Sequence, residues 1–493
     1  MTTGPLPIRT RLRSRPAPAP RRGVRAAFRG PLAGALCGLL LASGCGVLPG
    51  GGDDEPPVTV MTWAPLHTTG TNAPGMTAMA RAYERWVNSG GGIGGRELRV
   101  LVCDEGNESV AAAECARRAV REKAVAVVGS YSEQDAAIFS PISLAGIPYL
   151  GGYGITHEEF VNPDSYPVNG GLPALIAAQG AQLAPDCDRV ALVRPEGVTG
   201  DTWPDLLRAG LRGAGGKGEV VDLPVPVASS DYTPQAGQVL DRLAPAPAAR
   251  RCVSVALGDS TAAFVDSFRR VAPSGGTGTG GTGAGGTGTG GTGAGGTGAG
   301  GTGAGGTGAG GTGAGATPAV RVGSVLGSVS QRLVDRSGGA SGPYEGAAVT
   351  GWYPPASDPR WATMKKVITR HAFGDNAIDP ADAGVQTTWI AYTALRRIVE
   401  SLGEGPVTAR TVRDALDKGT KVSTGGLTPT LSWGDDYARS VIGYPRTANT
   451  RVTHLEVRDG QLVAAQGTGD GPGATGDARE ALESEPTGSG GRE

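Results

Sequence analysis

Residues 124–150 read AVAVVGSYSEQDAAIFSPISLAGIPYL, and this stretch contains the pattern that decides the fold. The apolar run at 124–128 predicts a buried strand, residues 133–145 predict a helix, and residues 147–150 predict a second strand. Two strands joined by one helix form a βαβ unit, in which the strands run parallel within one sheet. The same alternation continues in both directions along the chain.

Before this stretch, the pattern predicts strands at 58–63 and 97–103 and helices at 74–88 and 109–122. The alternation restarts near residue 170 and runs to about residue 457. Two such blocks predict an α/β fold made of two doubly wound parallel-sheet lobes. The expected helices of the second block and the C-terminal part are 172–184, 203–213, 233–243, 261–271, 358–371, 381–402 and 408–416, and the strands are 189–193, 219–223, 253–257, 319–326, 346–352 and 452–457.

The N-terminus is predicted to be an export signal. Residues 1–44 contain eight arginines and no acidic residue, and the apolar run Pro31–Leu41 is too short to remain as a membrane span. The run ends in Leu41-Ala42-Ser43-Gly44-Cys45, which resembles the lipobox of bacterial lipoproteins. That resemblance implies a signal peptide at 1–44, a lipid on Cys45 and a flexible tether at 45–57 outside the membrane. An ordinary secretory signal is the alternative.

The charge of the remaining chain argues against nucleic-acid binding. Without residues 1–44 there are 37 Lys and Arg against 46 Asp and Glu, a net charge of −9. Such a chain is repelled by phosphate backbones.

Four cysteines remain after the predicted signal and the lipidated Cys45, and four thiols allow three pairings. Cys103 ends a strand and Cys115 sits in the next helix, whereas Cys187 and Cys252 each precede an apolar strand. We predict the pairs 103–115 and 187–252. A metal site is the rival interpretation, but the cysteines lack CxxC spacing and the four histidines are scattered. We therefore expect neither a metal nor another cofactor.

Two segments are predicted to be disordered. Residues 275–317 repeat a Gly-Gly-Thr-Gly-Ala/Thr pentad, which offers no large apolar side chain to a core and lacks the three-residue period of collagen. The polar tail at 466–493 is also rich in glycine.

Several motifs taken in order resemble branched-chain amino-acid-type (Leu/Ile/Val) solute-binding proteins of ABC transporters. The resemblance spans residues 58–465, interrupted by the pentad insert. It implies the type I periplasmic-binding-protein fold, in which two lobes joined by three crossings trap a ligand. The motifs are Ala64-Pro65-Leu66, Trp86 to Arg96, Ala126 to Ser132, Ala145 to Pro148, Ser230 to Thr233 and Ala391 to Ala394.

The resemblance also divides the chain. Lobe 1 is expected at 58–168 and 345–425, and lobe 2 at 169–344 and 426–465. The crossings are expected near Tyr166–Asn169, Thr350–Pro355 and Leu427–Trp433.

Ligands of doubly wound sheets bind beyond the carboxyl ends of the strands. Three loops there begin with a Ser or Thr followed three residues later by an acid, a pattern that starts helices. These are the loops of Ser132, Thr156 and Thr202, and we expect their helix N-termini to offer free N–H groups to a polar ligand. The first two loops match ligand-binding positions of the family, although such caps also occur without a ligand.

Aromatic residues at strand ends are the second expected component, since they can contact apolar parts of a ligand or pack the lobe faces. The predicted ligand-binding residues are Trp63, Tyr131, Ser132, Tyr153, Gly154, Ile155, Thr156, Thr202, Trp203 and Trp352.

One departure from the family concerns the ammonium group of an amino-acid ligand. Amino-acid binders place an acid after a lobe 2 strand, where this chain has Gly327-Ser328-Val329-Ser330. Glu196 or Asp201 could substitute from another loop; otherwise the ligand lacks an ammonium. The sequence does not name an amino acid, and amides, small acids, nucleosides and peptides stay open as ligands.

The sequence contains no dinucleotide fingerprint, P-loop, G-x-S-x-G elbow or H-E-x-x-H motif, so we expect a binding protein and not an enzyme. The predicted function is capture of a small polar metabolite, such as an amino acid or amide, by a monomer that delivers it to an ABC permease. The alternative is a ligand-sensing lipoprotein that signals to a separate membrane transducer.

Overall fold

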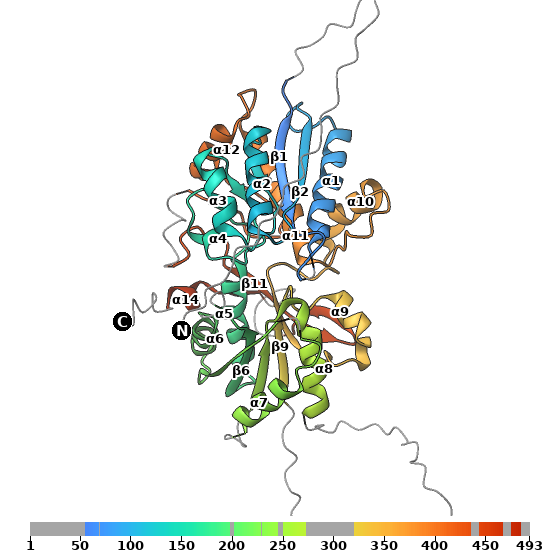
Figure 1. Cartoon of the computed structure of the whole chain (residues 1–493), viewed down its shortest axis with the longest axis vertical. Helices are drawn as coiled ribbons and strands as arrows, with labels where there is room; N and C mark the ends of the chain where they lie inside the picture. Colours follow the sequence, from blue (N-terminus) through green and yellow to red (C-terminus); the bar gives the residue numbers. More distant parts are fainter. Residues whose placement is uncertain are drawn as a thin grey trace, which may run out of the picture. The chain divides into compact units, whose positions relative to one another are not determined.

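The computed structural model describes residues 55–68, 70–197, 202–227, 229–244, 250–272, 320–434, 443–466 and 475–484. The predicted signal peptide, Cys45, the tether up to residue 54 and the pentad insert lie outside these residues. Within them the chain forms two sheets with helices on both faces, as the alternating pattern predicts (Figure 1). Lobe 1 contains the first sheet, and lobe 2 contains the second.

The first sheet is parallel, with strand order β2-β1-β3-β4-β5. Its inner strand β1 (Val58–Ala64), between β2 and β3, is buried along its whole length because helices cover both faces. Val58 and Val60 pack toward α1 (Pro74–Ser89) and α11 (Ala383–Ser401), whereas Met61 and Trp63 pack toward α2 (Ser109–Arg121) and α3 (Asp135–Leu144). The remaining elements of this lobe are β2 (Leu98–Asp104), β3 (Ala126–Val128), β4 (Tyr149–Leu150), α4 (Glu158–Val161), β5 (Ser165–Tyr166), α10 (Ala362–His371) and α12 (Ala409–Asp417).

The second sheet has the order β12-β11-β10-β9-β8-β6-β7, with β13 also paired to β11. Strands β7, β6, β8, β9 and β10 run parallel to one another. Strand β11 pairs antiparallel with β10, and both β12 and β13 pair antiparallel with β11. Helices α5 and α6 pack on one face, and α7 and α8 on the other. The elements are α5 (Gly171–Leu183), β6 (Arg189–Pro195), α6 (Trp203–Gly213), β7 (Glu219–Val225), α7 (Thr233–Leu243), β8 (Arg251–Val255), α8 (Thr261–Val271), β9 (Arg321–Val325), α9 (Gln331–Arg336), β10 (Ala348–Gly351), β11 (Arg451–Arg458), β12 (Gln461–Ala464), β13 (Thr475–Asp477) and α14 (Arg479–Glu483).

The chain passes between the two lobes three times, in the regions that the sequence predicts. The crossings follow β5, β10 and α12. They are bonded to one another: the Asn169 side-chain amide donates to the Tyr353 hydroxyl (3.1 Å), and the Trp433 indole donates to the Pro167 carbonyl (2.8 Å). These bonds join the first crossing to the second and to the third.

Two expected boundaries are wrong. Strand β10 lies between β9 and β11 in the second sheet, so the return to lobe 1 begins after Gly351 and not at residue 345. The C-terminal segment 466–493 is not wholly disordered, because β13 pairs with β11 and α14 buries Leu482. Composition alone missed this pairing, since a three-residue strand that extends an existing sheet needs little apolar sequence of its own.

Both disulfides join the cysteines that the sequence pairs. Cys103 is bonded to Cys115, and Cys187 to Cys252. Strands β6 and β8 are parallel neighbours, and this adjacency brings Cys187 and Cys252 together at their amino ends.

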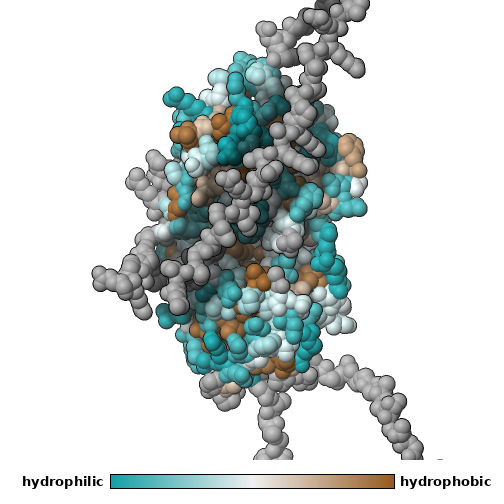
Figure 2. Space-filling model, in the orientation of Figure 1, coloured by the Kyte–Doolittle hydropathy of each residue, from teal (hydrophilic) through white to brown (hydrophobic). Residues whose placement is uncertain are grey.

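The exposed surface in Figure 2 is mostly hydrophilic, with small and scattered apolar patches. No helix in the described ranges is long and apolar enough to span a membrane.

Removing the two disulfides should have unequal effects. The bonds join residues 65 and 12 positions apart, and loop-closure entropy predicts stabilisation of about 4 and about 3 kcal/mol respectively. We expect the Cys187→Ser/Cys252→Ser pair to lower the unfolding free energy in urea more than Cys103→Ser/Cys115→Ser. The reverse order would show that unfolded-chain entropy does not dominate here.

Candidate functional site

Three aromatic side chains join the lobes at the carboxyl ends of the strands. Tyr131 follows β3, Tyr153 follows β4, and Trp352 follows β10 of the second sheet. The rings of Tyr131 and Tyr153 lie 5.1 Å apart, and those of Tyr153 and Trp352 lie 5.2 Å apart at nearly right angles. We call these three residues the strand-end cluster. Edge-to-face packing of this kind places neighbouring rings in direct contact.

Two further contacts between the lobes lie near this cluster. Gly327, after β9, has a φ of +98°, and a Cβ atom there would stand 2.7 Å from the Tyr153 hydroxyl. On α9, the Arg332 Nε lies 3.1 Å from a carboxylate oxygen of Asp379, in the segment before α11. Loops from both sheets therefore meet at their carboxyl ends, as ligand capture between lobes requires.

The Ser132 hydroxyl is already bonded within lobe 1. It donates to the buried Glu105 carboxylate (3.0 Å) and accepts from the Gln134 backbone N–H (3.0 Å). Glu105 also accepts from the Asn107 N–H, and burial raises the Glu105 pKa although these hydrogen bonds lower it. The predicted helix cap at Ser132 is thus wrong in detail. The hydroxyl accepts from Gln134, two positions later, and not from the third residue, and it positions the buried Glu105 carboxylate.

The loop Gly154–Thr156 shows a similar internal arrangement. The Glu159 carboxylate accepts from the backbone N–H groups of Gly154, Ile155 and Thr156, at 3.0–3.4 Å. Glu159 is buried, and this burial raises its pKa to about 7 against the opposing effect of the three N–H donors. The predicted Thr156 cap does not form: its hydroxyl is buried and has no partner within the described part of the chain. The N–H groups of Gly154, Ile155 and Thr156, three predicted ligand-binding residues, are thus bound by the chain's own carboxylate.

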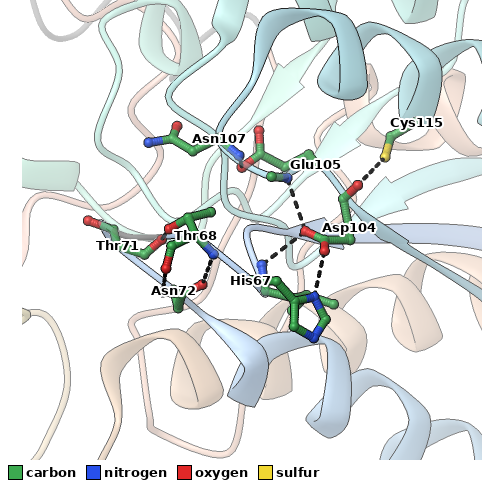
Figure 3. A network of polar contacts seen from close by, with 10 residues as sticks. His67, Thr68, Thr71, Asn72, Asp104, Glu105, Asn107 and Cys115 are labelled. Atoms are coloured by element: carbon green, nitrogen blue, oxygen red, sulfur yellow. Dashed lines mark hydrogen bonds and ion pairs between the residues drawn. The ribbon is translucent and has the colours of Figure 1, made fainter.

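Asp104 holds the loop that follows β1 (Figure 3). One carboxylate oxygen accepts from the N–H groups of Leu66 and Gly106, both at 3.0 Å, and the other lies 2.8 Å from His67 Nδ1. Partial burial raises the Asp104 pKa, but the bonds from His67, Leu66 and Gly106 outweigh it and leave the pKa below its usual value. The Cys103–Cys115 disulfide begins one residue earlier, so it fixes the same strand end.

A protein-family model described as "Periplasmic binding protein" matches residues 68–439. The chain belongs to the periplasmic binding protein family. No curated protein matches it.

Solved structures agree with the fold of this periplasmic binding protein. A leucine-binding protein from Thermotoga maritima is 16% identical (TM-score 0.56; 82% of this chain and 97% of that one). A fatty acid ABC transporter substrate-binding protein from Thermomonospora curvata is 13% identical (0.60; 87% and 95%). A solute-binding protein from R. palustris in complex with 4-hydroxybenzoate is 14% identical (0.57; 83% and 96%). Identities this low support the fold alone.

The structure places three predicted ligand-binding residues elsewhere in the periplasmic binding protein. Trp63 is fully buried and stacks on Tyr149 in the core beneath α2 and α3. Trp203 is buried in the core beside α5 and α6, and the exposed Thr202 makes no side-chain cap for α6. A strand-end position says which loop a residue occupies, but not which way its side chain points.

Two acids near Tyr153 were missed by the sequence analysis. The Tyr153 pKa is raised, chiefly by burial and then by the charges of Asp382 and Asp259. Asp259 follows β8, and Asp382 caps α11 through the Val385 N–H (2.9 Å). Glu196, named as a substitute acid, is exposed, and Asp201 lies outside the described residues. Because ligands bind beyond the carboxyl ends of the strands, the loop after β8 was a place in the sequence where Asp259 could have been found.

Glu159 should make stability depend on pH. Its folded pKa of about 7 exceeds the ordinary 4.5, so the folded state holds a proton that the unfolded chain has released between these values. This contribution is complete below pH 4.5 and is lost as the pH rises through 7, at most about 3 kcal/mol. Glu159→Gln should abolish that decline in urea unfolding across pH 4.5–7.5. The control is Glu158→Gln, one residue away; equal pH dependence in both variants would contradict the assignment.

Ser132→Ala should lower the unfolding free energy by about 1–3 kcal/mol, because Glu105 then loses a donor while remaining buried. Ser143 on α3 supplies the matched control, since its buried hydroxyl has no partner among the described residues. Ser143→Ala should change stability by less than about 0.5 kcal/mol. Equal effects in urea unfolding would show that the Glu105 bond contributes nothing.

Proposed function

We propose that this periplasmic binding protein closes two lobes on a small polar metabolite and delivers it to an ABC permease. The observation that carries the proposal is the contact of Tyr153, from the first sheet, with Trp352 and the Gly327 loop of the second. Tyr153 can make these contacts only when the two lobes lie together. Ligand binding would shift an open–closed equilibrium toward this closed arrangement.

We further propose that the chain is anchored outside the membrane by a lipid on Cys45. The lipobox-like sequence supports this, and the two disulfides are consistent with an oxidising compartment.

The ligand is proposed to present hydrogen-bond donors, as an amine or amide does. The Ser132 hydroxyl and the N–H groups of Gly154–Thr156 are bonded within the chain, so these groups are not offered to an anionic ligand. Asp259 and Asp382 lie close enough to Tyr153 to raise its pKa, and they supply acceptors. Arg332, which lies on α9 near the strand-end cluster, is already paired with Asp379. The tyrosine rings offer an apolar surface to the rest of the ligand.

A thermal-shift screen of the full chain tests this class, since a ligand that binds only the folded state raises Tm. The screen would compare amino acids, amides and amines with organic acids that lack a donor group. Hits confined to the donor-free acids would contradict the proposed class. No hit in any class would count against solute binding itself.

Gly327→Ala should weaken binding of the strongest hit about tenfold or more, because the new Cβ collides with the Tyr153 hydroxyl in the closed arrangement. Calorimetric titration would measure this. Gly346→Ala is the matched control: Gly346 also has a positive φ, +76°, but nothing lies within 4 Å of its added Cβ. Equal affinity in the two variants would show that closure does not bring Tyr153 against Gly327.

A further inference from the structure

A second site is suggested by a cavity at the hinge. A cavity of about 680 Å³ lies between residues 352–360 of the second crossing, residues 426–429 of the third, and strands β11, β12 and β13. This volume is within the range that holds small organic ligands. We call it the hinge cavity.

The hinge cavity differs from the strand-end cluster. Of the residues predicted or assigned to the solute site, only Trp352 lines it. Trp352 is held in place by its indole N–H, which donates to the Gly171 carbonyl at 2.9 Å, and by edge contact with Tyr153. A ligand in the hinge cavity would therefore bind beside the solute site and not within it.

Much of the lining is apolar. Trp352, Leu427 and Val452 are each at most 5% exposed, and Val463, Ala464 and several prolines complete the apolar surface. This lining favours a ligand with a hydrocarbon or aromatic body, because such a body gains from leaving water.

The charged lining is positive on balance. Asp358 and Arg360 neutralise each other through two bonds, Nε to Oδ1 at 2.9 Å and Nη2 to Oδ2 at 2.8 Å. Arg360 Nη1 also donates to the Gly426 carbonyl at 2.6 Å, which joins the second crossing to the third. Arg451 has no side-chain partner within the described ranges, although its backbone is fixed by Asn449 and by pairing with β13. Among the described residues, the Arg451 guanidinium thus borders the apolar cavity without an ion pair, with Asp477 opposite it on β13.

We propose that the hinge cavity binds an amphipathic organic anion. Its carboxylate or sulfonate would bind Arg451, and its apolar body would lie against Trp352, Leu427 and Val452. A guanidinium matches the geometry of such oxyanions and is weakly hydrated, so it releases water readily.

The test uses 8-anilinonaphthalene-1-sulfonate, an aromatic sulfonate whose fluorescence rises on burial, titrated into the full chain. Arg451→Glu should weaken its Kd about tenfold or more, because a charge-assisted bond becomes a repulsion. Arg410→Glu, at an exposed arginine of α12, should leave the Kd unchanged. Equal Kd values for wild type and Arg451→Glu would overturn the proposal.

A second variant tests the apolar part. Ala464→Trp should fill the cavity and abolish the fluorescence rise, with circular dichroism confirming that the variant is folded. If it does not fold, Ala464→Leu provides the smaller filling. Probe binding that falls with Tyr131→Ala and not with Arg451→Glu would place the probe at the strand-end cluster and overturn the proposal. These outcomes do not depend on whether the metabolite screen finds a solute.

Discussion

Burial of the parallel strands on both faces is the constraint from which the site follows. Neither face of β1 or β6 is free to meet a solute, because helices cover both. The carboxyl ends of the strands remain, and the three crossings bring those ends from two sheets toward each other. The contact of Tyr153 with Trp352 is the direct result.

Buried acids hold the loops of the candidate site. Glu105 holds Ser132, and Glu159 holds three consecutive N–H groups. Both carboxylates lie in a medium that disfavours their charge, as their raised pKa values show. The fold retains them because each satisfies donors that would otherwise be buried without partners. These loops are thus held by the chain's own hydrogen bonds in the absence of a solute.

Much of the fold was predictable from the sequence, because the spacing of apolar residues and the positions of glycines determine helices, strands and turns locally. The two sheets, the three crossings and both cysteine pairs follow from that pattern and the family resemblance. Strand β13 and the assignment of β10 were not predictable, since each depends on a pairing partner distant in sequence. Tyr131, Tyr153 and Trp352, three of the predicted ligand-binding residues, lie in one cluster, and their role in binding stays a prediction. Trp63 faces the core instead, and the role of Glu159 depends on a short loop folding back on itself.

The place where the pentad repeat joins the fold has an evolutionary consequence. The chain leaves after α8 and returns at Arg321, the amino end of β9, whereas the strand-end cluster and Gly327 lie beyond the carboxyl ends. Residues 273–319 therefore join the described fold at the end of the sheet opposite the strand-end cluster. Tandem repeats in a gene change copy number easily, and here such changes would act at the end of the sheet away from the strand-end cluster. The same junction is a suitable position for inserting a reporter domain.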